Sequence, residues 1–412
     1  MKNPAIFTIP KKPIVFRSIG VMQRSQNMNY FPIHTGQAVK AIFLERANRF
    51  LVRCIADELG IINAYLPNPG RLWGLLLPGV ILYLYPDHLF ERIRPSKRKT
   101  NYTVLAVQRK GSPIFLHTTI TNQVARYLIE MKFIPSLEGA EVIKNEISYG
   151  KSRFDFLLRQ NGRDIYVEVK SCTLCENGVA MFPDAVTERG KRHLLELSEM
   201  ARNGIRTVML FIVHYPHVQW FMPDFHTDYD FSLHMLKVKN DLIILPVAIE
   251  WKSDLSISQR VKTLEIPWDY LQHEIKDRGS YLLVLHLERQ KLIEVGRLGS
   301  FMFQKGYYIY VGSAMSNLRA RIKRHRQKRK KMHWHIDYLT RVTDGFISIP
   351  IRSSQRQECE IAQALSSIMK GGPSGFGSSD CTCFTHLFWS EKIPLQMESF
   401  HTILQRFRMR KP

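Results

Sequence analysis

The sequence predicts a multidomain protein of mixed α/β (α+β) class, and three observations support this prediction. First, a chain of 412 residues is too long for one ordinary domain. Second, residues 36–116 contain a series of short β-favouring runs, which predicts a small barrel. Third, residues 117–251 follow the order hairpin, helix and buried strand, and a new strand-and-helix pattern begins at Gly279. We therefore expect a barrel, a mixed sheet with flanking helices and a small α/β domain.

The expected domain boundaries follow changes in hydrophobic periodicity. Residues 1–35 contain several prolines and no clear periodicity, so they are interpreted as a flexible extension, with Met22 and Met28 as alternative starts. Residues 252–277 lose the strand pattern and are interpreted as a linker. The other boundaries are a barrel at 36–116, a mixed-sheet domain at 117–251, a small α/β domain at 278–392 and a basic tail at 393–412.

The composition indicates a folded chain that binds a polyanion. Hydrophobic residues make up 45% of the sequence, which is sufficient for packed cores. The 59 Lys and Arg against 36 Asp and Glu give a formal net charge of +23, which favours nucleic acid, and DNA in particular, as the partner. A basic protein without this partner is the alternative. The cysteine content fits a reducing cytoplasm, and no apolar run approaches the roughly 20 residues of a membrane-spanning helix.

The barrel is predicted from five β-favouring runs, at 39–43, 49–53, 79–85, 103–108 and 114–118. Five short strands in about 80 residues favour an OB-fold. Its cations are expected to line a groove for a nucleic-acid backbone, and an ordinary solvated basic surface is the alternative. These cations are Arg46, Arg49, Arg71, Arg92, Arg94, Lys97, Arg98 and Lys99.

The central domain is predicted to begin with a helix at 122–131 and a β-hairpin. Two β-favouring runs, at 153–158 and 165–170, flank Asn161 and Gly162, which form a strong hairpin turn signal. A helix at 187–202, a buried strand at 207–213 and a further strand at 242–249 follow. This order predicts a mixed sheet.

The hairpin carries a constellation of acids and one amine. Because side chains alternate along a strand, Glu168 and Lys170 share a face, and the hairpin brings Asp155 alongside Glu168. With Glu146 upstream, these residues predict a site for Mg²⁺, or Mn²⁺, held by Asp155 and Glu168. Lys170 would orient the attacking water during phosphodiester hydrolysis. A simple surface ion pair between Glu168 and Lys170 is the alternative.

The start of the helix at 187–202 is a secondary candidate for substrate contact. Asp184, Thr187, Glu188, Arg189 and His193 follow a proline there, and a helix N-terminus favours phosphate. Capping of the helix by Asp184 and Thr187 is the alternative. Arg153 and Arg189 are predicted to contact nucleic acid.

The C-terminal domain contains a basic segment and a cluster of metal-ligand residue types. A helix is predicted at 317–331 with nine Lys or Arg, of which Arg319, Lys323 and Arg324 are expected to contact phosphates. If six of the nine cations met phosphates, log K would fall with log salt at a slope of roughly −5. Cys381, Cys383 and His386 resemble part of a metal site that His333, His335 or Cys359 would complete, and unliganded thiols are the alternative. The C-x2-C pair Cys172 and Cys175 lacks a second pair nearby.

Residues 36–250 resemble the sugar fermentation stimulation protein (SfsA) family. The resemblance rests on the motifs R-A-N-R-F-L-V, P-N-P-G-R-L, Y-G-K-S-R-F-D-F-L-L, Y-V-E-V-K-S and F-P-D-A-V-T-E-R-G-K-R-H-L, which occur in order. It implies an N-terminal OB-like domain followed by a PD-(D/E)XK nuclease-like domain. In that pattern Glu146 is the upstream acid, Asp155 and Glu168 are the metal-binding acids, and Lys170 is the lysine.

Residues 278–390 resemble a less studied domain related to GIY-YIG nucleases. The resemblance rests on G-S-Y at 279–281, Y-V-G at 310–312, L-R-A-R at 318–321, H-W-H-I-D-Y-L at 333–339, E-C-E at 358–360 and G-F-G-S-S-D-C-T-C-F-T-H-L. It implies that Tyr281 and Tyr310 are the paired tyrosines, Arg321 the phosphate-stabilising arginine and Glu358 the metal carboxylate, with Glu360 as the alternative for the last role. Ser280 replaces the usual isoleucine, and the gap between the two tripeptides is longer than in the nuclease pattern.

Together these observations predict a cytoplasmic, Mg²⁺-dependent nuclease that hydrolyses DNA or RNA. A DNA-binding regulator of sugar-metabolism genes without turnover is the alternative, as the family name implies.

Overall fold

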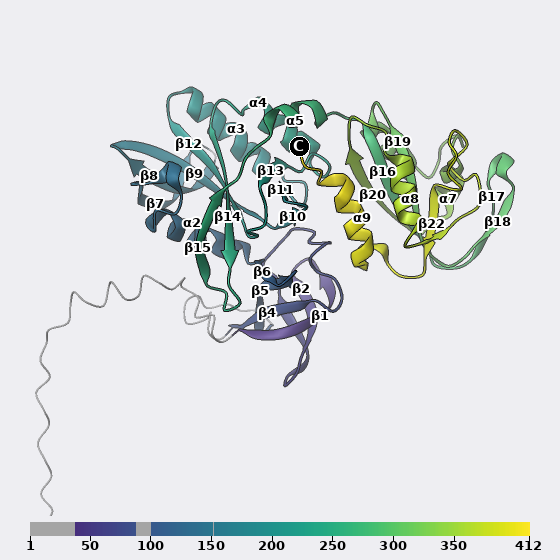
Figure 1. The fold of residues 1–412 in the computed structure, drawn as a ribbon, viewed down its shortest axis with the longest axis horizontal. Coiled ribbons are helices and arrows are strands. Elements are labelled where there is room, and N and C mark those ends of the chain that lie inside the picture. Colours follow the sequence, from purple (N-terminus) through teal and green to yellow (C-terminus); the bar gives the residue numbers. More distant parts are fainter. Residues whose placement is uncertain (1–37, 88–99, 151) are drawn as a thin grey trace, which may run out of the picture. The chain divides into compact units, whose positions relative to one another are not determined.

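The computed structural model describes residues 38–87, 100–150 and 152–412, whose arrangement Figure 1 shows. The predicted extension at 1–35 lies outside the described residues, as do five of the predicted groove cations: Arg92, Arg94, Lys97, Arg98 and Lys99. Among the described residues, no helix is long and apolar enough to cross a membrane.

The first domain is a closed barrel, as predicted. Its strands are β1 (Val39–Asn48), β2 (Leu51–Ala56), β3 (Gly60–Tyr65), β4 (Ile81–Pro86), β5 (Tyr102–Arg109) and β6 (Ser112–Phe115). They pair in the order β3-β2-β1-β4-β5-β6, and an additional pairing of β3 with β5 closes the sheet on itself. β1 has a bulge between Phe43 and Glu45, which lets one strand pair with both β2 and β4 around the core.

The central domain is built on a mixed six-stranded sheet of order β15-β14-β12-β9-β8-β7. These strands are β7 (Glu141–Tyr149), β8 (Ser152–Gln160), β9 (Arg163–Cys172), β12 (Arg206–Val213), β14 (Ile243–Trp251) and β15 (Ile257–Thr263). β12 runs parallel to both β9 and β14, whereas β8 and β9 form the predicted antiparallel hairpin. Asn161 and Gly162 have φ values of 51° and 74°, which is the geometry that a tight hairpin turn requires.

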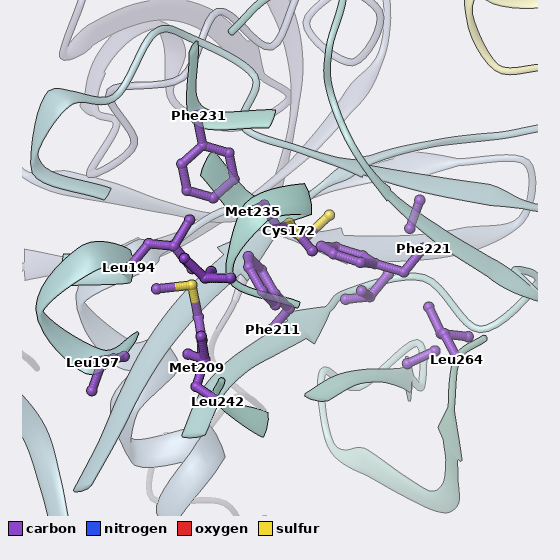
Figure 2. Packing of buried hydrophobic residues seen from close by; sticks show 14 of the residues in the cluster. Cys172, Leu194, Leu197, Met209, Phe211, Phe221, Phe231, Met235, Leu242 and Leu264 are labelled. Atoms are coloured by element: carbon purple, nitrogen blue, oxygen red, sulfur yellow. The ribbon is translucent and has the colours of Figure 1, made fainter. Parts of the chain in front are cut away.

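Three helices and a small sheet complete the central domain. α2 (Thr121–Glu130) packs against β7 and β9, and α3 (Glu188–Arg202) packs against β12 beside α4 (Tyr229–Lys237). Figure 2 shows Leu194 of α3 beside Met209 of β12, and Leu197 and Phe211 belong to the same core cluster. The small sheet pairs β10 (Leu174–Glu176), β11 (Val179–Phe182) and β13 (Trp220–Pro223). Leu195 of α3 is exposed.

The C-terminal domain has a five-stranded antiparallel sheet of order β20-β16-β19-β22-β21. Its strands are β16 (Gly279–Leu287), β19 (Gly306–Ala314), β20 (Gly345–Arg352), β21 (Lys370–Gly371) and β22 (Leu387–Ser390), and β17 (Lys291–Glu294) pairs with β18 (Ser300–Phe303) outside it. Alternate residues of β16 enter two cores: Tyr281 and Leu283 face α6 (Leu318–Arg326) and α7 (His335–Val342), whereas Leu282 and Val284 face α8 (Glu358–Ser366) and α9 (Glu398–Arg408).

Three segments differ from the sequence-based expectation. The segment expected as a linker contributes β15 to the edge of the central sheet and then α5 (Trp268–Glu274). The segment expected as a basic tail contains α9, because Phe400, Leu404 and Phe407 repeat at helical spacing and are buried. The prediction of a helix over 317–331 is wrong in its second half, since α6 ends at Arg326, where like charges crowd the chain.

The chain's last residues return to the central domain. The guanidinium of Arg408 lies 2.9 Å from Oδ1 of Asp224 and also donates to Thr227, and all three groups are buried or half-buried. Met409 packs in one cluster with Met222 and Phe225. The end of α9 is therefore part of the packing of the central domain.

Candidate functional site

Three of the predicted catalytic residues, Asp155, Glu168 and Lys170, lie close together where the pairing of β8 with β9 ends. The last strand pair of this hairpin is Phe156 with Val167. Beyond it the Asp155 carboxylate accepts a hydrogen bond of 2.7 Å from the backbone N–H of Val169, in place of a contact between the two backbones. Glu168 is the next residue of β9, and Lys170 follows on the same side. The structure thus brings Asp155, Glu168 and Lys170 together.

Glu168 is held by two basic side chains. Its side chain is only 3% exposed, Lys170 donates to its Oε1, and Nδ1 of His193 on α3 lies 2.6 Å from the same oxygen. Burial raises the pKa of the Glu168 carboxyl, but the contacts with His193 and Lys170 outweigh burial and leave that pKa below its ordinary value. Within the described part of the chain, the buried Oε2 of Glu168 has no hydrogen-bond partner. A carboxylate oxygen left free in this way is suited to a cation.

Asp155 has a different electrostatic environment. Burial, reinforced by the charge of Glu168, raises the pKa of its carboxyl, although hydrogen bonds from Val169 and from Nδ2 of Asn122 oppose the rise. Asn122 lies in the first turn of α2, so this helix fixes one carboxylate oxygen at 2.7 Å. Asp155 thus has a raised pKa, whereas its neighbour Glu168 has a lowered one. A divalent cation between the two carboxylates would stabilise both of them in the charged form.

A pocket of about 300 Å³ opens beside these groups. Lys170 and Asn122 line it, together with Arg49 and the loop residues Asn68 to Gly70 of the barrel domain. The loop that precedes α3 forms another wall, and its Asp184 accepts a hydrogen bond of 2.6 Å from the N–H of Leu72. Burial raises the pKa of Asp184 to about 6. The site is therefore open to solvent through a cavity, whereas the Glu168 side chain lies beneath it.

Two predicted residues of the central domain lie at its surface. Glu146 has a φ of 55°, its side chain is 65% exposed, and its carboxylate lies 3.6 Å from the guanidinium of Arg153. The structure therefore places the Glu146 carboxylate beside Arg153 at the surface rather than among Asp155, Glu168 and Lys170. Two other residues that surround the acids, Asn122 and His193, were not assigned these contacts from the sequence, because they lie on helices far from the hairpin along the chain.

The predicted cations of the barrel and of α3 that the structure describes have four different environments. Arg46 donates to the carbonyl oxygens of Asn68, Gly70 and Arg71, so its guanidinium fixes the loop that lines the pocket. Arg49 lines the pocket itself. The guanidinium of Arg71 lies 4.7 Å from the ring centre of Trp73, outside this pocket. Arg189 is exposed, and its Nε lies 3.5 Å from Nε2 of His193.

A second pocket, of about 410 Å³, lies in the C-terminal domain. All four residues predicted there, Tyr281, Tyr310, Arg321 and Glu358, line it. The tyrosines come from the paired strands β16 and β19, with ring centres 6.4 Å apart. The guanidinium of Arg321 lies 4.2 Å from the ring centre of Trp334, which holds the charge at the pocket wall.

Tyr281 belongs to a buried chain of polar contacts. Its hydroxyl lies 2.8 Å from Nε2 of His325, and Nδ1 of His325 lies 3.2 Å from Oδ1 of Asp337. Burial raises the pKa of the Tyr281 phenol well above its ordinary value, although Arg321 opposes this. Gly312 permits this arrangement, because a Cβ at that position would lie 2.5 Å from the Tyr281 hydroxyl. Only glycine fits there.

The basic segment 319–331 is largely engaged within the protein. Arg319 pairs with Asp230 and Asp277, and Arg324 pairs with Asp337. Lys328 and Lys330 donate to groups near the end of α7. Three cations of this segment are exposed, and within the described part of the chain their side chains form no hydrogen bond or ion pair: Lys323, Arg329 and Lys331. Three phosphate contacts imply a contribution of about −3 to the slope of log K against log salt, smaller than the slope expected for six.

Comparison with known families places the three domains. The SfsA N-terminal OB domain matches residues 44–116, the sugar fermentation stimulation protein RE domain matches residues 119–254, and DUF123, a domain of unknown function, matches residues 280–409. A sugar fermentation stimulation protein homolog from Methanosphaera stadtmanae is 37% identical over 228 residues, which cover 54% of this chain and 93% of that protein. The chain belongs to the sugar fermentation stimulation protein family. Both resemblances stated from the sequence are confirmed, with DUF123 as the GIY-YIG-like part.

Other members of the SfsA family also match about half of this chain. The homolog from Moorella thermoacetica is 39% identical over 195 residues, which cover 47% of this chain and 82% of that protein. A solved structure of Pyrococcus furiosus SfsA in complex with Ca²⁺ matches with a TM-score of 0.51 and 30% identity, covering 57% of this chain and 97% of that chain. The match therefore accounts for the barrel and central domains, to which this chain adds the DUF123 domain.

Replacing His193 by alanine is expected to lower the rate of any metal-dependent reaction at the Glu168 site by roughly 10–100-fold, because Glu168 would lose the partner that orients it. The expected signature is a higher divalent-metal concentration for half-maximal activity. His217→Ala is a matched control, since His217 is an exposed histidine of the same domain. Unchanged metal dependence in His193→Ala would contradict an orienting role.

Proposed function

We propose that this SfsA-family protein is a divalent-metal-dependent nuclease that hydrolyses phosphodiester bonds of nucleic acid. The observation that carries the proposal is the convergence of Asp155, Glu168 and Lys170 beside one pocket, which Lys170 lines. The net charge of +23 supports a polyanionic substrate, with DNA favoured. The Ca²⁺ complex of the Pyrococcus furiosus relative supports a divalent cation, and we infer Mg²⁺ or Mn²⁺ for catalysis.

The residues at the site fit such a cation. Asp155 and Glu168 would hold it, since the free, buried Oε2 of Glu168 and the half-buried carboxylate of Asp155 are hard oxygen donors. A bound cation of this type lowers the pKa of a water ligand and polarises a phosphoryl oxygen. Glu146, the upstream acid of the pattern, is proposed only as a peripheral ligand, because its carboxylate is exposed and lies near Arg153.

The protein's own groups orient and stabilise the reactants. Asn122 and the Val169 N–H fix both oxygens of Asp155, and His193 fixes Glu168 from α3. The Lys170 amine lines the pocket while donating to Glu168, where its charge would orient the attacking water and offset negative charge that develops on the phosphate. Arg49, which also lines the pocket, would bind an adjacent phosphate.

Metal dependence tests the proposal directly. The full chain, stripped with a chelator, is incubated with end-labelled single- and double-stranded DNA and RNA, with and without Mg²⁺ or Mn²⁺. We expect cleavage of at least one substrate only when the metal is present. Binding to these substrates without cleavage under any metal would instead support the alternative, a DNA-binding regulator without turnover.

We propose that the C-terminal pocket binds a second phosphate of the same substrate through Arg321. We expect Arg321→Ala to weaken binding by roughly tenfold, because one charge-assisted contact contributes about 1.5 kcal/mol. Cleavage per bound complex should not change. The measurement is a binding titration paired with single-turnover cleavage, and Arg341→Ala is the control, since Arg341 is exposed on α7 and does not line the pocket.

The same experiment assigns the role of Tyr281, Tyr310 and Glu358. If Arg321→Ala removes turnover while affinity is unchanged, these residues form a second catalytic centre, as the GIY-YIG resemblance implies.

A further inference from the structure

Three thiols and one imidazole meet at a single point in the C-terminal domain. Cys359 comes from α8, and Cys381, Cys383 and His386 come from the segment that leads into β22. One ligand atom from each of these four residues lies within 4.8 Å of the others. Among the residues that the structure describes, this is the cluster of histidine, cysteine and acidic groups with metal-ligand geometry.

The distances match a tetrahedral site before any rearrangement. Nε2 of His386 lies 3.5 Å from Sγ of Cys381 and 3.9 Å from Sγ of Cys359. Zinc bonds of about 2.0–2.3 Å to nitrogen and sulfur place tetrahedral ligands roughly 3.5–3.8 Å apart. All three cysteines are free thiols rather than disulfides. A metal ion at the centre would bind the three sulfurs and Nε2 of His386, in place of the contacts that these atoms make with one another.

The surroundings of His386 resemble those of a metal-binding histidine. The residue is 1% exposed, and its ring hydrogen-bonds to the backbone of Gly377 while Nε2 faces the sulfurs. Histidine ligands usually use their second ring nitrogen in this way, which fixes the tautomer and the ring orientation. The backbone around it is also ordered by hydrogen bonds, from His386 N to Phe376 O at 2.9 Å and from Gly375 N to Phe384 O at 2.8 Å.

We propose that Cys359, Cys381, Cys383 and His386 bind one Zn²⁺ in a structural Cys₃His site. Three thiolates and an imidazole are the soft ligands that favour zinc over Mg²⁺ or Ca²⁺. Because the protein supplies all four ligands, the ion has no open position for a substrate or a reactive water, and its role is structural. The C-x-C spacing of Cys381 and Cys383 made this site hard to identify without the ligand from α8.

The zinc site is connected to the pocket of the C-terminal domain. Cys359 follows Glu358, and His386 itself lines that pocket. Gly377, which lies in the segment closed by the ion, packs so tightly against Tyr310 that a Cβ would come within 2.6 Å of the ring. The ion would thus fix the N-terminal turn of α8 to the segment 372–386 and hold Glu358 and Tyr310 in place.

Metal content of the full chain is the first test. After purification with zinc and exhaustive dialysis, elemental analysis is expected to find about one zinc per chain. Replacement of zinc by Co²⁺ is expected to give a strong thiolate-to-cobalt charge-transfer absorption and the visible bands of a tetrahedral complex. Cys381→Ser and His386→Ala should each remove most of the zinc. Cys175→Ala is the matched control and should retain it, because Cys175 belongs to the separate C-x2-C pair.

Alkylation of the wild-type protein avoids any dependence on whether the variants fold. We expect Cys359, Cys381 and Cys383 to resist iodoacetamide with zinc present and to react after chelation, as read by peptide mass spectrometry. Equal labelling with and without zinc would overturn the proposal. A disulfide among these cysteines in the reduced, zinc-supplied protein, or loss of zinc only in Cys175→Ala, would overturn it as well.

Discussion

Glu168→Gln is expected to lower phosphodiester cleavage by roughly a thousandfold, since removal of an anionic metal ligand costs about 4 kcal/mol of transition-state stabilisation. Asp155→Asn should have an effect of similar size. Both replacements are isosteric. The amide oxygen introduced at position 168 can still accept from Lys170, and the one introduced at position 155 can still accept from the Val169 N–H, whereas Asn122 must turn its own amide oxygen toward the new NH2 group. Single-turnover cleavage with the substrate identified above is the measurement, with circular dichroism to verify folding.

The matched control for these variants is Asp164→Asn on the same hairpin. Asp164 forms an exposed ion pair with Arg159, which is expected to contribute little to stability because solvent screens it. Its cleavage rate should equal that of the wild type. Retention of full activity by Glu168→Gln would refute catalysis at this site, even if the protein still binds nucleic acid.

Asp337→Ala is expected to destabilise the C-terminal domain by about 3–5 kcal/mol. The Asp337 carboxylate is fully buried and accepts hydrogen bonds from the N–H groups of His333 and Trp334, while Arg324 and Lys330 lie 3.1 and 3.3 Å away. Removal of the Asp337 carboxylate would leave Arg324 and Lys330 without the anion that both of them contact. Hydrogen exchange of α6 and α7 measures the loss, and Asp344→Asn, which alters an exposed acid that follows α7, should change little.

The same carboxylate predicts a pH dependence. Burial by itself raises the pKa of Asp337, but hydrogen bonds from His325 and the backbone and the charge of Lys330 outweigh burial and lower that pKa well below its ordinary value. A lowered folded-state pKa contributes stability that is complete above the unfolded value of about 3.9 and is lost as pH falls further. The wild type should therefore lose stability below about pH 4 more steeply than Asp337→Ala. Parallel acid-unfolding curves would contradict this account.

The local parts of the site could be predicted from the sequence. The turn at Asn161 and Gly162 fixes the register of β8 and β9, and the register then places Asp155 beside Glu168. Period-two alternation fixes the common face of Glu168 and Lys170. These inferences need only neighbouring strands, and the hairpin confirms them.

Contacts between distant elements could not be predicted in the same way. His193 reaches Glu168 only because α3 packs against β12 and β8, and no spacing in the sequence encodes that packing. Arg46 looks like a groove cation by composition, yet it binds carbonyl oxygens of a loop more than 20 residues away. The apolar repeat of α9 was hidden by basic residues that share its turns. The composition gives the number of cations in the chain, but it does not show which groups each cation binds in the folded protein.

The return of α9 to the central domain has a practical consequence for dissecting this protein. A chain severed after the central domain would leave Asp224 buried without the guanidinium that neutralises it, and would open a void beside Met222 where Met409 had been. An activity measured on such a fragment would then change for two reasons: the missing domain is absent, and the packing of the central domain against the end of the chain is lost. Point substitutions within the intact chain separate these effects.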